Sequence, residues 1–377
     1  MKLCIVTAIV AKGNGQGRVN YEVAQEAIER GHQVTLVASS VAPDLYEHPQ
    51  VQWVSIPAKR FPSALIREAI FSYKSARWLK QHQAEFDLIK VNGAITSASS
   101  DVNAVHFVHS AWLESNVNPD RGIRNRNLHG LYHWLYSTLN TQWEAKAFRN
   151  TKVIIAVSEK VKQEIVRLGI PGESIQVVLN GVDLNEFYPG RVDRQALELP
   201  GNIPLALFAG DIRTPRKNLD TVLHALVQVP KLHLVVAAGV EKSPYPQLAE
   251  KLCVKERVHF IGYRRDIPKL MQAVDLFVFP SRYEACSLAL LEAMASGLPV
   301  ITAQTTGGSE IVTSDCGVVL SNPDDVQSLT EALNQLMDDP ENLYQMGQAA
   351  RKVAEQYSWQ QQAKAYVDRF EDMVAIS

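Results

Sequence analysis

The sequence predicts an α/β protein with two doubly wound parallel sheets. Its 377 residues favour two domains over one. Short apolar runs alternate with amphipathic segments along almost the whole chain, which is the pattern of repeated strand–loop–helix units. A turn-rich segment, 188–201, separates two sets of such units. Because parallel sheets bind ligands at the carboxyl ends of their strands, we expect functional residues in the loops that follow the strands.

The first set of units predicts a domain over residues 1–187. Gly31 is placed to end its first helix, and Ser158 is placed to cap its last one. The expected strands are 3–9, 33–38, 51–56, 88–91, 105–108, 153–157 and 175–179, and the expected helices are 19–30, 62–83, 127–149 and 159–168.

The second set predicts a domain over residues 188–358, followed by a last helix at 359–373. The pairs Asp324–Asp325 and Asp338–Asp339 lie at helix boundaries, so we expect them to cap helices rather than to bind metal. The expected strands are 205–209, 232–237, 258–261, 276–279, 300–302 and 317–319, with helices at 287–296, 325–337 and 341–356.

Composition excludes several classes of protein. The net charge of −2 gives no bias toward nucleic acid, and no apolar run approaches the roughly 20 residues of a membrane-spanning helix. The first eight residues are apolar but lack a cleavage site, so they predict a strand and not a signal peptide. The four cysteines have no metal-binding spacing, which favours reduced thiols in a cytoplasmic protein without a zinc site.

Two glutamates eight residues apart, Glu284 and Glu292, are the most informative motif. Glu284 lies in the loop after the strand 276–279, and Glu292 lies on a helix face whose other residues are small or apolar. A partly buried carboxylate needs donors, and sugar hydroxyls are good candidates. The N–H groups of 285–287, at the start of that helix, suit a phosphate. The motif therefore predicts a site for a phosphate attached to sugars.

Two further loops suit anions. Arg213, Arg216 and Lys217 follow the first strand of the second domain, where three cations in five residues suit a diphosphate. A solvated surface loop is the alternative. The loop 13–18 is glycine-rich and opens a helix, but its G-x-G-x-G spacing and the lack of an acid after the second strand do not match the dinucleotide fingerprint. A flexible turn is the alternative there.

Two more segments follow strands. His109 comes just after the expected strand 105–108, where it could bond a sugar or help an acceptor proton to move. His106 is expected inside that strand in a structural role. The segment 305–311 contains a Gly-Gly turn, which would bring more backbone N–H groups to the same strand ends.

Taken together, these motifs resemble the retaining glycosyltransferases of the GT-B fold, sequence family 4. The resemblance covers nearly the whole chain and is nearest to the branch of lipopolysaccharide-core glucosyltransferases. Its most specific element runs from Glu284 to Glu292 and on to Gly297–Val300. The supporting landmarks are Ala156–Glu159, Val178–Asp183, Phe187–Pro189, Arg213–Asn218, Phe260–Tyr263 and Gly307–Glu310.

The resemblance implies roles for individual residues. Arg213, which we prefer over Arg216, and Lys217 would bind the donor diphosphate and stabilise the leaving nucleotide. Glu284 would hold the donor sugar and Glu292 the ribose, and the last helix, within 359–377, would pack back on the first domain. The remaining implied contacts are His109 with the sugar, backbone around Ala285, Cys286, Ser287 and Leu288 with the phosphates, Tyr263 and Arg264 beside the base, and Gly15, Gly17 and Arg18 at the donor–acceptor junction.

The implied reaction is metal-independent transfer of a hexose from a nucleotide diphosphate sugar, with no cofactor, to a glycan or lipid-linked acceptor of polysaccharide, lipopolysaccharide or glycolipid synthesis. Ala285–Ser287 departs from the family's glycine-rich loop and points to UDP-glucose, whereas Asn92 replaces a family histidine. A GT-B nucleotide-sugar epimerase, a nicotinamide-dependent dehydrogenase and a non-catalytic sugar-binding protein are the alternatives.

Basic and aromatic residues interleave over 58–80 and 121–136. These segments could rest on an anionic membrane, at the inner face of the plasma membrane, or grip an acidic or lipid-linked glycan. An ordinary amphipathic helix with a solvated basic face is the alternative.

Overall fold

The computed structural model describes residues 1–13, 15–57, 63–118 and 128–376, and it divides into two compact units. The first unit comprises Met1–Gly181 and Trp359–Ser377, and the second comprises Val182–Ser358. The division therefore falls after Gly181, whereas the sequence placed it after Phe187. The basic residues expected at Lys59, Arg60, Arg121, Arg124 and Arg126 lie outside the described residues.

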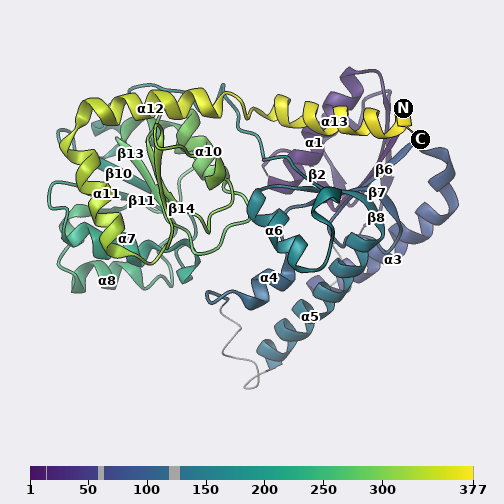
Figure 1. Ribbon diagram of the computed structural model, residues 1–377, viewed down its shortest axis with the longest axis horizontal. Helices are drawn as coiled ribbons and strands as arrows, with labels where there is room; N and C mark the ends of the chain where they lie inside the picture. Colours follow the sequence, from purple (N-terminus) through teal and green to yellow (C-terminus); the bar gives the residue numbers. More distant parts are fainter. Residues whose placement is uncertain (14, 58–62, 119–127, 377) are drawn as a thin grey trace. The chain divides into compact units, whose positions relative to one another are not determined.

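A seven-stranded parallel sheet forms the centre of the first unit, in the order β5-β3-β1-β6-β7-β8-β9 (Figure 1). Two short strands, β2 (Ile9–Val10) and β4 (Ser40–Val41), follow β1 and β3 in the sequence and form a separate two-stranded sheet. The main strands are β1 (Lys2–Val6), β3 (Gln33–Ala38), β5 (Val51–Ser55), β6 (Leu88–Asn92), β7 (Ser100–Val105), β8 (Thr151–Ala156) and β9 (Ile175–Val177).

Helices cover both faces of this sheet, so its central strands β1 and β6 are buried on both sides. On one face, Val6 and Val91 pack against Phe71 and Leu79 of α3. On the other, α1 and α13 pack together, and Arg30 bonds Glu371 at 2.8 Å. The helices of the unit are α1 (Gly15–Glu29), α2 (Pro43–Tyr46), α3 (Ala64–His82), α4 (His109–Glu114), α5 (Leu128–Arg149), α6 (Glu159–Arg167) and α13 (Trp359–Ile376).

The second unit has a six-stranded parallel sheet in the order β12-β11-β10-β13-β14-β15. Its strands are β10 (Leu205–Ala209), β11 (His233–Ala237), β12 (Val258–Phe260), β13 (Leu276–Phe279), β14 (Val300–Ala303) and β15 (Gly317–Leu320). Its helices are α7 (Leu219–Val227), α8 (Tyr245–Lys251), α9 (Ile267–Ala273), α10 (Leu288–Ala295), α11 (Val326–Asp338) and α12 (Pro340–Ala354).

One strand prediction was wrong. The apolar run 105–108 predicted a strand there, but β7 spans Ser100–Val105. Polar side chains inside β7 bond its neighbours: Asp101 accepts a hydrogen bond from the Ile89 N–H at 2.8 Å, and Asn103 donates to the Gly93 carbonyl at 3.0 Å. Pairing with adjacent strands therefore outweighs local apolar content, and His106 lies beyond the strand instead of inside it.

Three of the predicted helix caps are confirmed, those of Ser158, Asp325 and Asp339. Ser158 accepts a hydrogen bond from the Val161 N–H at 3.1 Å. Asp325 and Asp339 accept from the N–H groups three residues later, each at 3.0 Å. Asp324 instead forms an ion pair with Arg282 at 2.6 Å. Within the described residues, no helix combines the length and apolar character that a membrane-spanning segment requires.

Gly347 provides a test of packing in the second unit. A methyl group at Gly347 on α12 would overlap the carbonyl oxygen of Gly297, which follows α10. We expect Gly347→Ala to lower the free energy of unfolding by about 1–3 kcal/mol, the usual effect of overpacking. Gly201→Ala is the control, because a methyl group there meets open space. Urea unfolding with equal loss in both variants would contradict this account.

Candidate active site

Two loops of the second unit meet because β10 and β13 are neighbours in a parallel sheet. The loop after β13 bonds to the loop after β10: the Arg282 N–H donates to the Arg216 carbonyl at 2.9 Å, and the Ser281 hydroxyl donates to the same carbonyl at 3.0 Å. Asn218, in a left-handed conformation, donates to the Pro280 carbonyl at 2.9 Å. The basic loop is thereby held against the loop that carries Glu284.

Glu284 is the centre of this contact. Its carboxylate forms an ion pair with the Lys217 ammonium and accepts from the Arg216 guanidinium at 3.3 Å. The Lys217 and Glu284 side chains are only 13% and 17% exposed. The Lys217 ammonium also lies 4.9 Å from the centre of the Phe279 ring. Two cations thus share one carboxylate in a shielded position, which leaves a positive charge.

Burial lowers the pKa of Lys217, and the nearby Glu284 carboxylate opposes this effect. Burying the Lys217 ammonium is costly unless a negative charge lies next to it, so an anion at this position is favourable for Lys217.

Arg213 takes a different position from the one the sequence favoured. Its side chain is 65% exposed and bonds both oxygens of Asp211, at 2.9 and 2.7 Å. The Arg213 hydrogen bond lowers the pKa of Asp211 to about 2. The structure therefore brings Arg216 and Lys217 to Glu284, while Arg213 is held outward by its own loop. Asp211, two residues before Arg213, is the sequence signal that could have indicated this pairing.

The first turn of α10 lies beside the Gly-Gly turn, as the sequence predicted. The Ser287 hydroxyl caps α10 by accepting from the Leu290 N–H at 3.2 Å, and the Ser287 N–H donates to the Gly307 carbonyl at 2.9 Å. The Gly307 N–H donates in turn to the Glu284 carbonyl at 2.9 Å. Gly308, at φ +95°, would place a methyl group 3.9 Å from the Ser287 nitrogen. The loops 284–287 and 305–308 therefore form one backbone assembly that also contains Ala285 and Cys286.

The other predicted donor contacts are more widely spread. Glu292 is half-buried on α10, as its apolar helix face suggested, and Leu288 opens that helix. Tyr263 and Arg264 follow β12, which β11 separates from β10 in the sheet. Tyr263 is 78% exposed, and Arg264 bonds Asp266 at 2.7 and 2.6 Å.

The first unit holds His109 at the start of α4 against a buried carboxylate. Glu144 of α5 is 2% exposed, and it accepts from both the His109 backbone N–H at 2.8 Å and His109 Nδ1 at 2.6 Å. Since a carboxylate accepts only, Nδ1 carries the proton, and Nε2 is the basic atom of the ring. Glu144 was missed by sequence reasoning because it lies 35 residues from His109 and no local motif links them.

A cavity of about 280 Å³ adjoins His109 and Glu144. The cavity is also lined by His106, Asn92 and Gln16. Because β7 ends at Val105, His106 and His109 both lie in the segment after the strand and reach the same cavity. Burial lowers the pKa of His106 to about 3, with a smaller effect from the charge of Lys90.

Lys90 lies in the interior next to this cavity. Its ammonium donates to the side-chain oxygens of Asn20 and Asn92 and lies 5.8 Å from the centre of the Tyr366 ring. Burial lowers the pKa of Lys90 to about 7.

The glycine-rich loop leads directly into α1, which begins at Gly15 and not, as expected, at residue 19. Gly17 is buried, and its carbonyl accepts from the Ala11 N–H at 3.3 Å. Arg18 bonds Glu22 at 3.1 Å, and its guanidinium lies 4.9 Å from the centre of the Trp359 ring. Arg18 therefore links α1 to the start of α13. Among the side chains that the structure describes, no three His, Cys, Asp or Glu residues cluster as metal ligands do.

Comparison with known families covers both units. The family described as Glycosyltransferase Family 4 matches residues 13–186, and the family described as Glycosyl transferases group 1 matches residues 191–353. The chain belongs to glycosyltransferase family 4. Its two parallel-sheet units are those of the GT-B fold, and the protein is a glycosyltransferase.

Individual relatives are distant but nearly full-length. The chain is 25% identical over 406 residues to the MMP alpha-(1->4)-mannosyltransferase of Mycolicibacterium hassiacum, covering 96% of this chain and 95% of that protein. It is 24% identical to the lipopolysaccharide glucosyltransferase WaaG of Escherichia coli, covering 84% of each. The solved structure of WaaG has a TM-score of 0.74 at 22% identity, over 98% of this chain and 99% of that one. Anabaena Alr3699/HepE, solved in complex with UDP and glucose, has a TM-score of 0.69 at 20% identity, over 99% and 100%.

Lys90 generates a prediction about pH. Below pH about 7 the lysine is protonated both folded and unfolded, and the cost of its burial is fully present. Between its folded pKa of about 7 and the unfolded value of about 10.4, the unfolded chain binds more protons, so stability rises with pH. Lys90→Met cannot titrate, and we expect its stability advantage over wild type to shrink by a few kcal/mol from pH 6.5 to 9.5.

Urea unfolding of both proteins at several pH values measures this difference, and groups common to both cancel. Lys152→Met is the control, because Lys152 is 69% exposed. A stability difference that does not change with pH would contradict the buried-lysine explanation.

Proposed function

We propose that this glycosyltransferase transfers a hexose from a nucleotide diphosphate sugar with retention of anomeric configuration, and that the donor is UDP-glucose. The observation that carries the proposal is the pair of cations, Arg216 and Lys217, on the single carboxylate of Glu284. The solved relative that is bound to UDP and glucose supports the choice of donor, as does the name of the lipopolysaccharide glucosyltransferase.

Donor binding would exchange the partners of these cations. A diphosphate carries more negative charge than one carboxylate, so Arg216 and Lys217 would transfer their hydrogen bonds to it. Glu284 would then be released to accept hydrogen bonds from the hydroxyls of the donor sugar. Apart from those of Ser287 and Leu290, which already have partners, the N–H groups at the start of α10 would contribute to the phosphate site. Glu292 would bind the ribose, and Tyr263 and Arg264 would lie beside the base.

The reaction follows from where negative charge develops. The bond between the anomeric carbon and the diphosphate oxygen breaks, and the acceptor oxygen forms a bond to the same face of that carbon. The acceptor proton passes to the departing phosphate oxygen. Arg216 and Lys217 would stabilise the charge on the leaving diphosphate, so no metal ion is needed in this scheme. In the first unit, Nε2 of His109 would bond a sugar hydroxyl, with Glu144 holding the ring in place.

The acceptor is a glycan or a lipid-linked glycan, and exposed cations of α3 would allow contact with an anionic membrane surface. The apolar side chains Phe71 and Leu79 face the core, whereas Lys74, Arg77 and Lys80 are exposed. This supports the amphipathic-helix alternative for the described part of 58–80, where Ile66 and Tyr73 are exposed as well as the cations.

A thermal-shift panel of UDP-, GDP- and ADP-linked sugars, followed by a transfer assay, tests the donor. Stabilisation by UDP-glucose is expected. A shift with GDP- or ADP-sugars and none with UDP-glucose would overturn the donor assignment. Conversion of the donor to another sugar without an acceptor would instead favour an epimerase.

Arg216→Ala and Arg213→Ala form a matched pair, because each removes one cation from the same loop. We expect Arg216→Ala to lower kcat/KM by about 10²–10³-fold, since it removes a group that stabilises the leaving diphosphate. Arg213→Ala should stay within a few-fold of wild type. The opposite ranking in steady-state kinetics would return the phosphate role to Arg213.

Glu284 and Lys217 should differ in which step they impair. Glu284→Ala is expected to abolish nearly all transfer while UDP still binds, because the carboxylate acts on the sugar. Lys217→Ala is expected to weaken UDP binding by about tenfold or more through loss of a charge-assisted hydrogen bond. Calorimetric titration with UDP separates the two effects, and normal turnover of either variant would refute the scheme.

A further inference from the structure

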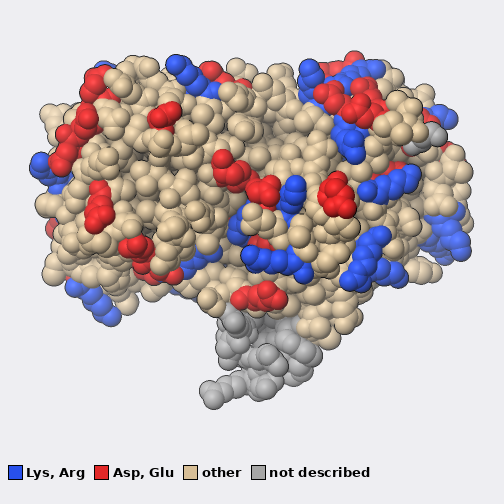
Figure 2. Space-filling model, viewed as in Figure 1, with Lys and Arg blue, Asp and Glu red and all other residues tan. Residues whose placement is uncertain are grey.

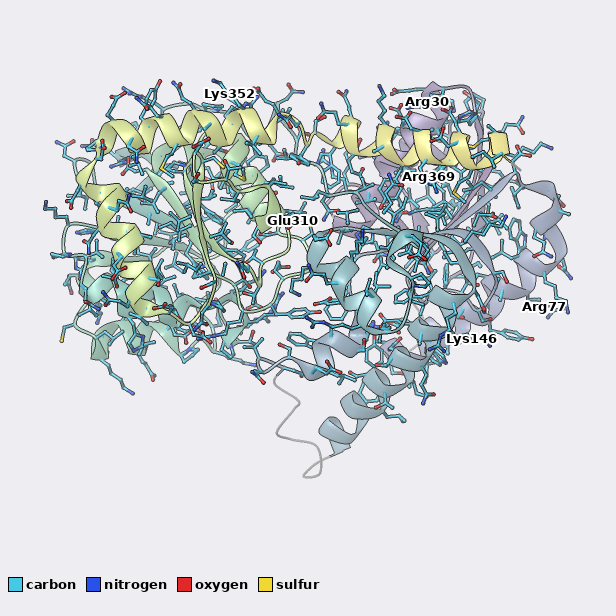
Figure 3. All side chains as sticks on the ribbon, viewed as in Figure 1. Arg30, Arg77, Lys146, Glu310, Lys352 and Arg369 are labelled. Carbon is cyan, nitrogen blue, oxygen red and sulfur yellow. The ribbon has the colours of Figure 1, made fainter. Side chains whose placement is uncertain are left out.

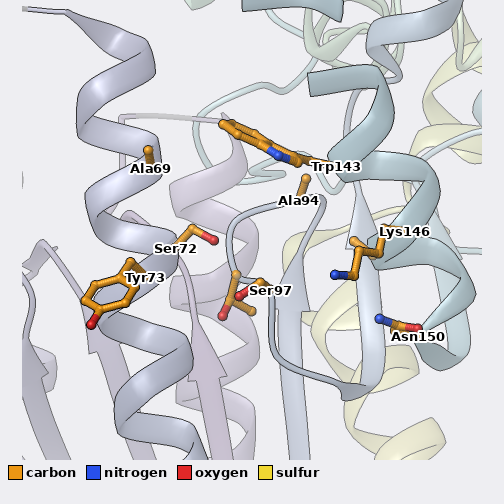
Figure 4. Close-up of a pocket in the computed structure, with 10 residues that line it drawn as sticks. Ala69, Ser72, Tyr73, Ala94, Ser97, Trp143, Lys146 and Asn150 are labelled. Atoms are coloured by element: carbon orange, nitrogen blue, oxygen red, sulfur yellow. The ribbon is translucent and has the colours of Figure 1, made fainter. Parts of the chain in front are cut away.

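A second cavity of the first unit, of about 260 Å³, lies next to the one at His109. The two cavities share three lining residues, Ser72, Ala94 and Trp143, so they adjoin along one groove. We call this the α3–α5 groove. Figure 4 shows its outer part, with Ala69, Ser72 and Tyr73 of α3 on one side, Trp143, Lys146 and Asn150 on the other, and Ala94 and Ser97 between them.

The chemistry of the outer cavity suits a sugar chain. Two aromatic side chains, Tyr73 and Trp143, offer flat surfaces on which the apolar faces of pyranose rings can pack. Hydroxyl and amide groups for sugar hydroxyls come from Ser72, Thr96, Ser97 and Asn150. Its aliphatic lining residues are all alanines, whereas a site for an acyl chain would present larger branched side chains. The lining therefore favours a glycan over a lipid tail.

Charge along the groove is asymmetric. The sequences of α3 and α5 contain one acid each, Glu68 and Glu144, and both line the His109 cavity. Tyr136 donates to Glu68 at 2.8 Å, and His109 bonds Glu144. At the other end, Lys146 lines the outer cavity.

Further exposed cations follow on α3, at Lys74, Arg77 and Lys80. Figure 3 labels Arg77 and Lys146 in this region, and Lys and Arg predominate over the corresponding part of the face in Figure 2. The outer end is therefore positive.

We propose that the α3–α5 groove binds the acceptor as an acidic oligosaccharide. The hydroxyl that receives the hexose lies at His109, the next sugar packs on Trp143, and a carboxylate or phosphate on the chain pairs with Lys146. This rests on the proposed function and adds the acceptor's class, its direction and the residues that select it. Trp143 and Lys146 belong to the first unit and the donor cluster at Glu284 to the second, so variants of the first pair test acceptor binding and UDP titration tests the donor site.

The test uses the full chain, fluorescently labelled, on an array of neutral and uronate- or phosphate-bearing oligosaccharides. Vesicles of phosphatidylglycerol and of phosphatidylcholine are examined in parallel. The variants are Lys146→Glu, Trp143→Ala and, as matched control, Arg149→Glu, which reverses an exposed cation on the same helix outside the groove lining. UDP titration of every variant checks that the donor site is intact.

We expect binding to acidic oligosaccharides that is weakened by about tenfold or more in Lys146→Glu and in Trp143→Ala, and within twofold of wild type in Arg149→Glu. Binding to no acidic glycan, or equal losses in the Lys146 and Arg149 variants, would overturn the groove assignment. Vesicle binding that depends on Lys146 without glycan binding would show a lipid surface instead. If the wild-type protein does not bind UDP, the proposed function itself is refuted. If it binds UDP but no acidic glycan, only this inference is refuted.

Discussion

The carboxylate of Glu284 is the interaction on which the candidate site depends. It lies where two neighbouring parallel strands, β10 and β13, end at the same edge of a sheet, and it joins the loops that follow them. Backbone hydrogen bonds from the Gly307 turn and from Arg282 hold the same loops. The position of each cation is therefore set by the sheet and not by the flexible side chain alone.

The charge balance of this cluster suits the proposed anion binding without making the cluster unstable in the absence of a ligand. Two buried or half-buried cations without a partner would carry a large desolvation cost, which Glu284 offsets. Because one carboxylate does not neutralise both, the cluster keeps an attraction for a more strongly charged ligand. The same group can then serve as a counter-ion before binding and as a hydroxyl acceptor afterwards, which connects the stability of the loop to its proposed chemistry.

The first unit also contains a carboxylate that holds a functional side chain, but here it fixes a histidine ring and does not balance cations. Glu144 is buried and accepts two hydrogen bonds from His109, so it sets both the orientation and the protonated nitrogen of the ring. Glu68 of α3 and Glu144 of α5 line the cavity at His109, whereas Lys146 of α5 lines the outer cavity of the α3–α5 groove. An extended acidic ligand would thus have one preferred direction, and its reactive end would be the one at the histidine.

The sequence by itself determined the two parallel-sheet units, the strands 33–38, 205–209 and 276–279, the helix caps and the family, because strand and helix patterns and capping are local properties of the chain. It also placed Lys217 and Glu284 in loops that follow strands, where such sheets bind ligands, and the structure brings these two side chains together. Only the tertiary structure decided where β7 begins and ends, the choice of Arg216 over Arg213 at Glu284, the pairing of His109 with Glu144, and the groove between α3 and α5. Each of these joins residues far apart in the chain, or selects between neighbours by contacts that no local pattern records.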